Sequence, residues 1–526
     1  MKQNIKSGII FGIIGGLLTF LFGKWSVAVI GILMGTGLGL SIGGEFIDKD
    51  RHPLTMVKEA LPTVTISATI LLVLSLLQNY FIAPFIGNVP SQSNIVIPAN
   101  LIGVLGGILF SLLTVWLHGL PDRAERIGKL ILLTVIVVAF PFVDNFTGLR
   151  WMAQIIFSLI FVILGMGLNI VVGYAGLLDL GYAAFFAIGA YTTAILSSTG
   201  SVLYIHHQII LNFWLVIPIA AAVAAIFGLL LGAPTLPLRG DYLAIVTLGF
   251  GEIVPVLFRN LIDVTINEPL SCWIIPGIQR LFGASSSVAC IVITSHLDLT
   301  AGEKGINPIS RPSLPLIGQF SSSNSIPWYF LIIIIIVFSI FLINRLRESR
   351  LGRAWMAIRE DELAAAQMGI DPVRTKLLAF AMGATFSGFA GTFYASYIAG
   401  IFPSVFEFSA SIIILCIVIL GGMGNIYGVI VGGLVINMTD RLLLPALKDF
   451  LAGLLNHTVL PALATNPTLQ SMVAQNANPT FYRWGLFGLV LVIMMAVRPE
   501  GLLPSARRRM ELHAAEENAG GPAVGK

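Results

Sequence analysis

Residues 150–181 read RWMAQIIFSLIFVILGMGLNIVVGYAGLLDLG, a long apolar run followed by a glycine-rich segment. Its apolar part, 150–172, is long enough to cross roughly 30 Å of hydrocarbon as a helix rising about 1.5 Å per residue. Similar apolar runs recur along the chain at 63–86, 97–117, 129–143, 181–199, 213–236, 241–258, 327–344, 377–398 and 482–498. The sequence therefore predicts an all-α protein, a polytopic transmembrane helical bundle.

Two other apolar stretches are interrupted. Lys24 breaks the stretch 8–44, which predicts a tight glycine-rich hairpin, and glycines at 421, 422 and 424 break 406–444 into two short helices. The prediction is thus about 11–14 membrane helices with broken or re-entrant segments. Residues 1–23 have a basic start and an apolar middle, as a signal peptide does. Because no small-residue cleavage site precedes Lys24, a retained helix is the better interpretation.

The composition excludes an ordinary soluble protein, because 56% of the residues are hydrophobic and only 11% are charged. The net charge of +4 is modest, and the basic residues lie in short loops, which argues against nucleic-acid binding. Cys272 and Cys290 share one long loop; they pair only if that loop faces an oxidising compartment, and two unpaired cysteines are an equally open interpretation.

Basic loop residues predict the orientation, because Lys and Arg are retained on the cytoplasmic side. Residues 345–376 are the richest in arginine, whereas 259–326 contain few basic residues for their length. We therefore expect 345–376 in the cytoplasm, 259–326 and 445–480 outside, and both termini inside. The tail 507–526 has the composition of a disordered, solvated end.

The segment after the apolar run 150–172 is unusual for membrane depth. It carries Gly173, Gly176 and Gly181 together with Asp179, and glycines weaken a helix while a carboxylate is costly there. Irregular backbone at that depth persists only inside protein or beside a wet cavity, which indicates a break near a solute path. The alternative is that the glycines permit close helix packing and Asp179 caps the next helix.

A second polar feature lies on the run 241–258. Asp241 is placed to begin that helix as its N-cap, and Glu252 lies about three helical turns further on. We therefore expect one inward face that carries Asp241, Thr247 or Leu248, and Glu252. The alternative is that Glu252 pairs with Arg259 at the outer end of the helix.

The arginine-rich loop predicts a rigid protrusion. Residues 353–368 are strong helix formers without a breaker, Gly369 stops that helix, and Asp371 with Pro372 begins the next one. Such a protrusion would fit a groove on a partner, with arginines supplying charge and alanines 364–366 allowing close approach. Taken alone, the loop is better interpreted as a solvated, positive-inside connection.

Five ordered blocks together resemble one known family. They are GYAGLLDLGYAAFFAIGAY (173–191), LRGDYLAIVTLGFGEI (238–253), SRLGRAWMAIREDELAAAQMGIDPVRTKLLAF (349–380), GGMGNIYGVIVGG (421–433) and RPEGLL (498–503). These blocks resemble the LivM-type permease subunit of branched-chain amino-acid ABC importers. The resemblance does not reach residues 1–127, so we expect an extra N-terminal transmembrane region (1–127), a permease core (128–506) and the tail (507–526).

The resemblance implies that residues 349–372 form a coupling loop that docks on an ATP-binding subunit. The candidate contact residues are Arg350, Gly352, Arg353, Arg359, Glu362, Ala364, Ala365 and Gly369. This chain departs from the general importer pattern, because Leu363 stands where an acid is expected and the acid is one position earlier, at Glu362.

The resemblance also implies a translocation path for a small aliphatic amino acid such as Leu, Ile or Val. The candidate path residues are Gly173, Tyr174, Gly176, Asp179, Tyr182, Asp241, Thr247 and Glu252. The expected partners are two ATP-binding subunits that hold ATP and Mg, a second homologous permease, an external binding protein and a lipid bilayer, in a prokaryotic plasma membrane. No cofactor or nucleic acid is expected on this chain.

Three other functions are alternatives to an amino-acid ABC permease. The sequence contains no Gly-x-x-x-x-Gly-Lys-Ser/Thr motif, and its histidines do not cluster, so ATP hydrolysis, a metal site and a catalytic site are not predicted here. An intramembrane enzyme would need Asp179 to converge with Asp241 or Glu252 as an acid–base pair. An ion-coupled secondary transporter fits the broken segment but not the protruding loop. A urea or short-chain amide ABC importer is the nearest alternative.

Overall fold

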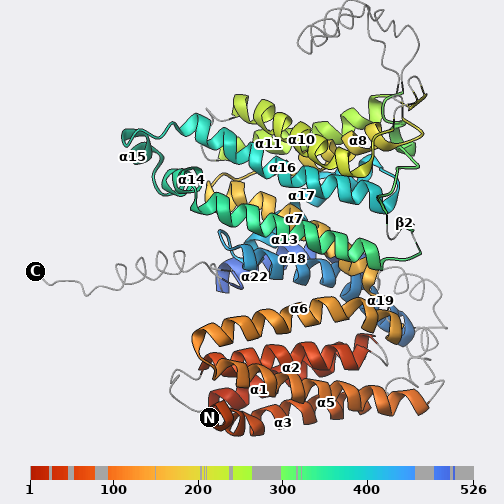
Figure 1. The fold of residues 1–526 in the computed structure, drawn as a ribbon, viewed down its shortest axis with the longest axis vertical. Helices are drawn as coiled ribbons and strands as arrows, with labels where there is room; N and C mark the ends of the chain where they lie inside the picture. Colours follow the sequence, from red (N-terminus) through yellow and green to blue (C-terminus); the bar gives the residue numbers. More distant parts are fainter. Residues whose placement is uncertain are drawn as a thin grey trace, which may run out of the picture. The chain divides into compact units, whose positions relative to one another are not determined.

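A computed structural model gives the fold (Figure 1). It describes residues 2–22, 26–45, 53–77, 93–148, 150–201, 204–205, 208, 210–235, 241–262, 298–315, 318–321, 323–455, 479–497 and 501–503. The predicted tail 507–526, both loop cysteines and most of the predicted external loop 259–326 lie outside these residues. The chain divides into two compact units: unit 1 is Met1–Met152 with Thr439–Trp484, and unit 2 is Ala153–Met438 with Gly485–Lys526.

Unit 1 consists of consecutive apolar helices. They are α1 (Lys2–Phe22), α2 (Ser26–Glu45), α3 (Pro53–Leu77), α5 (Ser93–His118) and α6 (Asp122–Thr147), followed later in the chain by η5 (Thr439–Leu443), α19 (Leu444–Leu454) and η7 (Pro479–Tyr482). The separate helices α1 and α2 confirm the division predicted within 8–44. Helix α6 runs across the predicted boundary at 127/128 and belongs to unit 1.

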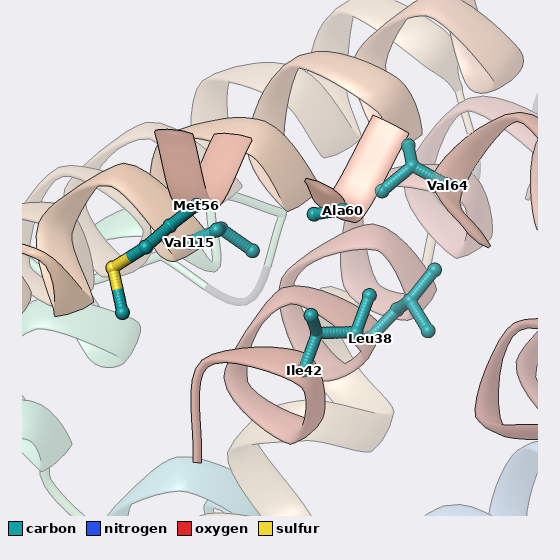
Figure 2. Packing of buried hydrophobic residues seen from close by; sticks show 6 residues of the cluster. All are labelled: Leu38, Ile42, Met56, Ala60, Val64 and Val115. Carbon is teal, nitrogen blue, oxygen red and sulfur yellow. The ribbon is translucent and has the colours of Figure 1, made fainter. Parts of the chain in front are cut away.

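The helices of unit 1 pack through glycines. A Cβ atom at Gly31 would collide with the carbonyl of Gly103, and one at Gly35 would collide with Gly107, so the backbones of α2 and α5 are in direct contact. On α1, Gly12 packs in the same way against Ser67 of α3. Figure 2 shows the apolar cluster of α2, α3 and α5. Its buried members are Leu38, Ile42, Met56, Ala60, Val64 and Val115.

Unit 2 contains most of the remaining helices. They are α7 (Met152–Leu168), η2 (Asn169–Tyr174), α8 (Ala183–Ser197), α10 (Phe213–Thr235), α11 (Asp241–Asn260), η3 (Gly302–Lys304), α13 (Ile326–Glu348), α14 (Arg350–Glu360), α15 (Glu362–Gln367), α16 (Pro372–Ile398), η4 (Pro403–Phe406), α17 (Phe408–Gly421), α18 (Ile426–Met438) and α22 (Arg483–Val497). The short strands β1 (Ser313–Leu314) and β2 (Gly318–Gln319) pair antiparallel.

Helix α16 packs against both α8 and α10 in unit 2, and these two helices also contact each other. Small residues bring these helices together: Gly388 packs on Ala221 of α10, and Gly391 packs on Ala190 of α8. Aromatic side chains fill the space nearer the end of α16, where the Phe186 ring meets Tyr394 at 5.4 Å and Phe406 at 4.9 Å. This packing holds the ends of α8, α16 and η4 in fixed positions.

The described residues include 10 helices that are long and apolar enough to cross a membrane, and shorter apolar helices at Lys6–Thr19, Val29–Ile42, Ala183–Ser197 and Arg483–Ala496. The predicted polytopic helical bundle is therefore confirmed. The stretch 406–444 is two helices, α17 and α18, as predicted. The run predicted at 63–86 begins earlier, because α3 starts at Pro53 and continues through Pro62 before it ends at Leu77.

Candidate coupling and translocation site

The arginine-rich loop folds into a protrusion whose helices all begin at a capping side chain. Ser349 accepts a hydrogen bond from the backbone N–H of Gly352 at the start of α14. Asp361 accepts from the amides of residues 363 and 364 at the start of α15, and Asp371 accepts from those of 373 and 374 at the start of α16. Figure 1 shows α14 and α15 projecting beyond the ends of α13 and α16.

The predicted continuous helix 353–368 is wrong, because the chain leaves helical geometry at Asp361, where φ is −154° and ψ is 110°. An aspartate side chain competes for nearby amides and so favours a cap over a helix interior. The stop at Gly369, with φ of +85°, and the restart at Asp371 and Pro372 are as predicted. The protrusion is therefore two short helices joined by a bend.

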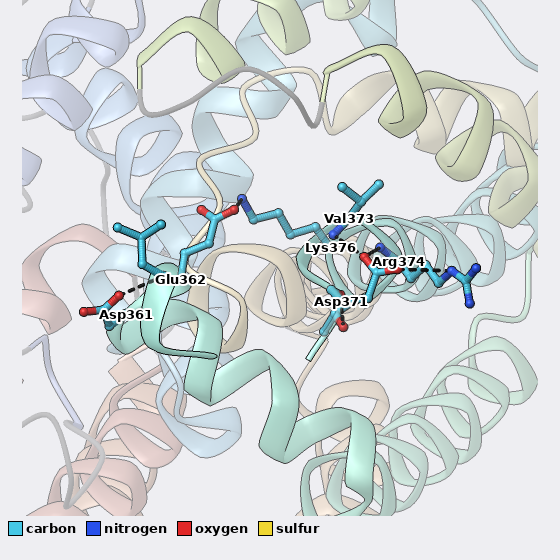
Figure 3. A network of polar contacts seen from close by, with 8 residues as sticks. Asp361, Glu362, Asp371, Val373, Arg374 and Lys376 are labelled. Carbon is cyan, nitrogen blue, oxygen red and sulfur yellow. Dashed lines mark hydrogen bonds and ion pairs between the residues drawn. The ribbon is translucent and has the colours of Figure 1, made fainter. Parts of the chain in front are cut away.

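Two bonds fix this protrusion to α16. The indole N–H of buried Trp355 donates to the carbonyl of Thr375 at 2.7 Å. The Lys376 ammonium, buried in the protein, lies 2.7 Å from a carboxylate oxygen of Glu362 (Figure 3). Glu362, one of the candidate partner-contact residues, is thus engaged in an ion pair within the chain, which holds the protrusion against α16.

The tip of the protrusion presents apolar and small side chains. Leu363 is 65% exposed and Met368 is 84% exposed, whereas Ala365 is buried. Arg350 and Arg353 are exposed on α14, where Arg353 donates to the carbonyl of Glu348. A surface that combines exposed apolar side chains with flanking arginines suits docking to a folded protein better than contact with water alone.

Arg359 connects the protrusion to the broken segment after α7. Its guanidinium donates to the carbonyl of Gly173, the fifth residue of the π-helix η2. At Gly176, where φ is +71°, a Cβ atom would lie 2.8 Å from Cγ of Arg359. Glycine therefore allows the arginine side chain to lie directly on the backbone. Arg359 thus joins α14 directly to residues 173–176.

The predicted break in the membrane segment is present. Helix α7 ends in the π-helix η2, and residues 175–182 are not helical before α8 begins. Side chains from other segments satisfy the exposed backbone groups: Thr247 Oγ1 accepts from the Leu180 N–H at 3.1 Å, and Ser411 Oγ accepts from the Ala183 N–H at 2.9 Å. Irregular backbone inside a bundle requires such partners.

Asp179 lies at the centre of this break and is 1% exposed. Its Oδ1 accepts from the Gly181 N–H at 2.9 Å, which forms a turn ahead of α8, so the alternative that Asp179 caps the helix is wrong. Its Oδ2 has no hydrogen-bond partner among the described residues. Asp179 lines a narrow cavity together with Thr247 of α11 and Phe380 of α16. This cavity has room for little more than a water molecule.

The two candidate tyrosines are buried. Tyr174 is 4% exposed, and Tyr182, which is fully buried, donates its hydroxyl to the Gly383 carbonyl of α16 at 2.7 Å. Neither ring faces open space in this conformation, so α16 and α8 close the region around the break.

Helix α11 divides its candidate residues between two faces. Thr247 is buried against the broken segment, whereas Glu252 is exposed, so these two residues do not share the predicted face; Leu248 is half-buried. The alternative pair of Glu252 with Arg259 is also wrong, because Arg259 meets Glu303 at 2.8 Å and Glu407 at 2.6 Å. Asp241 begins α11, and its side chain lies outside the described part of the chain.

With this geometry in place, comparison with known proteins decides the family. The family profile "Branched-chain amino acid transport system / permease component" matches residues 151–495. The chain belongs to this permease family. The match begins at the start of α7 and covers the broken segment, α11 and the protrusion of α14 and α15.

Individual relatives agree with this assignment. The high-affinity branched-chain amino acid transport system permease protein LivM of Escherichia coli (strain K12) is 38% identical over 385 residues, which cover 73% of this chain and 76% of that protein. A probable LivM of Methanocaldococcus jannaschii is 25% identical over 66% of this chain and 90% of its own length. A LivH permease protein of Salmonella typhimurium is 28% identical over 31% of this chain and 54% of that protein. No solved structure matches.

Sequence reasoning missed several residues that build this permease site. It did not single out Trp355, Lys376 or Ser411, and it gave Arg359 a role in docking only. In the sequence, Trp355 and Lys376 resemble surface residues of an amphipathic loop. They are buried because α14 and α15 pack against the beginning of α16. Within the described residues, no three His, Cys, Asp or Glu side chains group as metal ligands.

Proposed function

We propose that this chain is a permease subunit of an ATP-driven importer of branched-chain amino acids in a prokaryotic plasma membrane. Family membership and 38% identity to a LivM permease protein support the cargo. ATP and Mg bind to separate ATP-binding subunits, an external binding protein delivers the amino acid, and a related permease completes the path. The match to LivH permease proteins supports such a companion.

One observation carries the proposed mechanism: Arg359 connects the protruding helix α14 to the carbonyl of Gly173 in the broken segment. The exposed tip around Leu363 and Met368 docks on the ATP-binding subunit. Closure of two such subunits moves α14, and the Arg359 contact carries this movement to residues 173–182. That segment opens and closes the path beside Asp179.

The first test alters the tip without disturbing its supports. Leu363→Asp combined with Met368→Asp places two carboxylates on an exposed apolar surface. Charge on that surface opposes docking, so we expect the ATP-binding subunits to be lost on purification and uptake of labelled leucine to fall at least about tenfold. The matched control is Asn324→Asp, an added carboxylate at the other end of α13.

The outcomes separate the competing functions. Leucine uptake that persists in the double variant, or in cells lacking the ATP-binding subunits, contradicts an ATP-driven importer and favours an ion-coupled transporter. Uptake of labelled urea in place of leucine would support the proposed ATP-driven mechanism but identify urea as the substrate. Loss of uptake in the Asn324→Asp control as well would show that surface charge acts non-specifically.

A further inference from the structure

One face of α11 is exposed along the whole helix. The positions on it recur every three or four residues, as the residues of a single helical stripe do. The stripe consists of Tyr242, Ile245, Gly249, Glu252, Val256 and Asn260. Tyr242 is 70% exposed and Ile245 is 61% exposed, while Thr247 on the opposite face is buried.

This stripe differs from the exposed stripe of α13. Along the middle of α13 the exposed side chains are those of Ile334, Val337, Phe338 and Phe341, all apolar, as lipid-facing helices require. Its exposed charged residues, Arg345, Arg347 and Glu348, lie in the last turn. The stripe of α11 instead contains a carboxylate, an amide and a phenol. A helix that met only lipid along this face would place Glu252 in hydrocarbon.

Glu252 lies in the middle part of α11, away from both of its ends. It is the twelfth residue of the 20-residue helix α11, so it lies roughly 16 Å along the axis from the first residue. Ionisable residues at such depth face protein or a wet cavity. Arg259 is already occupied by Glu303 and Glu407, so the described part of unit 2 gives Glu252 no cation.

Gly249 lies beside Glu252 on the same stripe and leaves a gap. No described atom lies within 4 Å of the place where its Cβ would stand, in contrast to Gly251, whose Cβ would touch the backbone of Gly181. Small residues on an exposed membrane helix allow a second helix to approach closely. An open glycine next to an unpaired carboxylate therefore suits a partner helix that carries a hydrogen-bond donor or a cation.

We infer that the α11 stripe is the surface on which the companion permease packs, with Glu252 paired to a donor or cation of that subunit. The inference rests on the proposed function, because it requires a permease pair. The occupant is a related but different chain. Two copies of this chain would share one orientation in the membrane, so a symmetric pair using this stripe would bring both Glu252 carboxylates to the same depth, where like charges repel.

Site-specific crosslinking in the intact transporter tests the surface. A photoreactive p-benzoylphenylalanine replaces Ile245 or Val256 on the stripe, or Val337 on α13 as the control, in cells that also produce the companion permease, the ATP-binding subunits and the binding protein. Illumination should give a covalent adduct of this chain with the companion permease from both stripe positions and not from Val337. Adducts from Val337 but not from the stripe, or from none of the three positions, overturn the inference. An adduct of two copies of this chain overturns the choice of occupant.

Charge substitution gives a second, independent readout. Glu252→Gln keeps a hydrogen-bonding group and should retain the companion permease on purification, whereas Glu252→Lys should reduce the retained companion at least about tenfold at equal membrane levels. Equal retention in both variants overturns the pairing at Glu252. If the unmodified chain copurifies with no companion permease and the cells import no leucine, the proposed function itself is wrong. If the companion permease copurifies but the stripe positions give no crosslinks, only the assignment of this surface is wrong.

Discussion

The two units hold their helices together in different ways. In unit 1, Gly31 and Gly35 of α2 lie directly on the backbone of α5, and hydroxyls such as that of Thr114 donate to carbonyls of their own helix. In unit 2, side chains bond the backbone of other segments, as Tyr182 does with Gly383. Close backbone contact therefore joins helices in both units, as at Gly388 and Gly391 in unit 2, and unit 2 adds polar bonds across its broken segment.

This difference follows from the regularity of the helices. The long helices of unit 1 satisfy their own backbone groups, so only close packing is needed between them. In unit 2, the break after η2 exposes amides and carbonyls that Thr247, Ser411 and Arg359 satisfy. Polar bonds to irregular backbone can be exchanged when helices move, whereas glycine contacts cannot change without separating the helices. We therefore expect the transport movement at the broken segment of unit 2, where these polar bonds lie.

The largest expected effect is on the stability of unit 1. Gly35→Leu would force α2 away from Gly107, and overpacking of this kind should lower the free energy of unfolding by about 3 kcal/mol. Thermal unfolding of the purified protein in detergent measures this loss. Gly488→Leu is the control, since no described atom lies within 4 Å of a Cβ at that position. Equal melting temperatures for the two variants would contradict backbone contact between α2 and α5.

A smaller effect distinguishes the hydroxyls of the two units. Thr247→Val removes the acceptor of the Leu180 N–H and should cost about 2 kcal/mol, because a partly buried donor loses its partner. Thr114→Val in unit 1 should cost much less, since its hydroxyl donates to carbonyls of its own helix. Unfolding of both variants under the same conditions compares the costs. Similar losses would remove the distinction between the units.

The contact of Arg359 should affect transport more than folding. Arg359→Met removes the bond to Gly173 and should reduce leucine uptake about tenfold, or about 1.4 kcal/mol, with the ATP-binding subunits still bound. Arg374→Met is the control, because the exposed side chain of Arg374 pairs with Asp371, three residues away, and is not one of the candidate contact residues. Its uptake should change less than about twofold. Equal uptake in the two variants would reject transmission through Arg359.

Local signals in the sequence predicted much of this site. Glycines at 173, 176 and 181 mark the break, and Asp371 with Pro372 marks the start of α16, because these residue types act on the backbone beside them. Asp361 also acts on nearby backbone, as the N-cap of α15. The strong helix formers on both sides of it led to the prediction of one continuous helix. The Arg359–Gly173 bond joins residues 186 positions apart, and no local pattern predicts such a contact.

The faces of α11 show a second limit. Counting eleven residues from Asp241 to Glu252 predicts that they lie near one face. Thr247, however, is five residues from Glu252, and at roughly 100° per residue it points to the other side. Periodicity gives the angle between residues on a helix. It does not say which side meets the rest of the chain, because that depends on where the broken segment packs.

The smallest expected effect lies at the tip of the protrusion in unit 2. Gly369 has a φ of +85°, and no described atom lies within 4 Å of the place where a Cβ would stand. A substitution there should therefore destabilise the protein through an unfavourable backbone conformation and not through a steric clash. Gly369→Ala should therefore cost about 1 kcal/mol, and Gly369→Asn less, because asparagine tolerates positive φ. Gly35 is the opposite case: its backbone is helical, and a larger side chain is excluded only by the steric clash with α5. Unfolding and retention of the ATP-binding subunits, measured for both variants, check this. If the asparagine variant is the less stable of the two, the bend does not depend on the left-handed conformation at Gly369. The contrast between Gly369, needed for its backbone conformation, and Gly35, needed for close packing, would then be wrong.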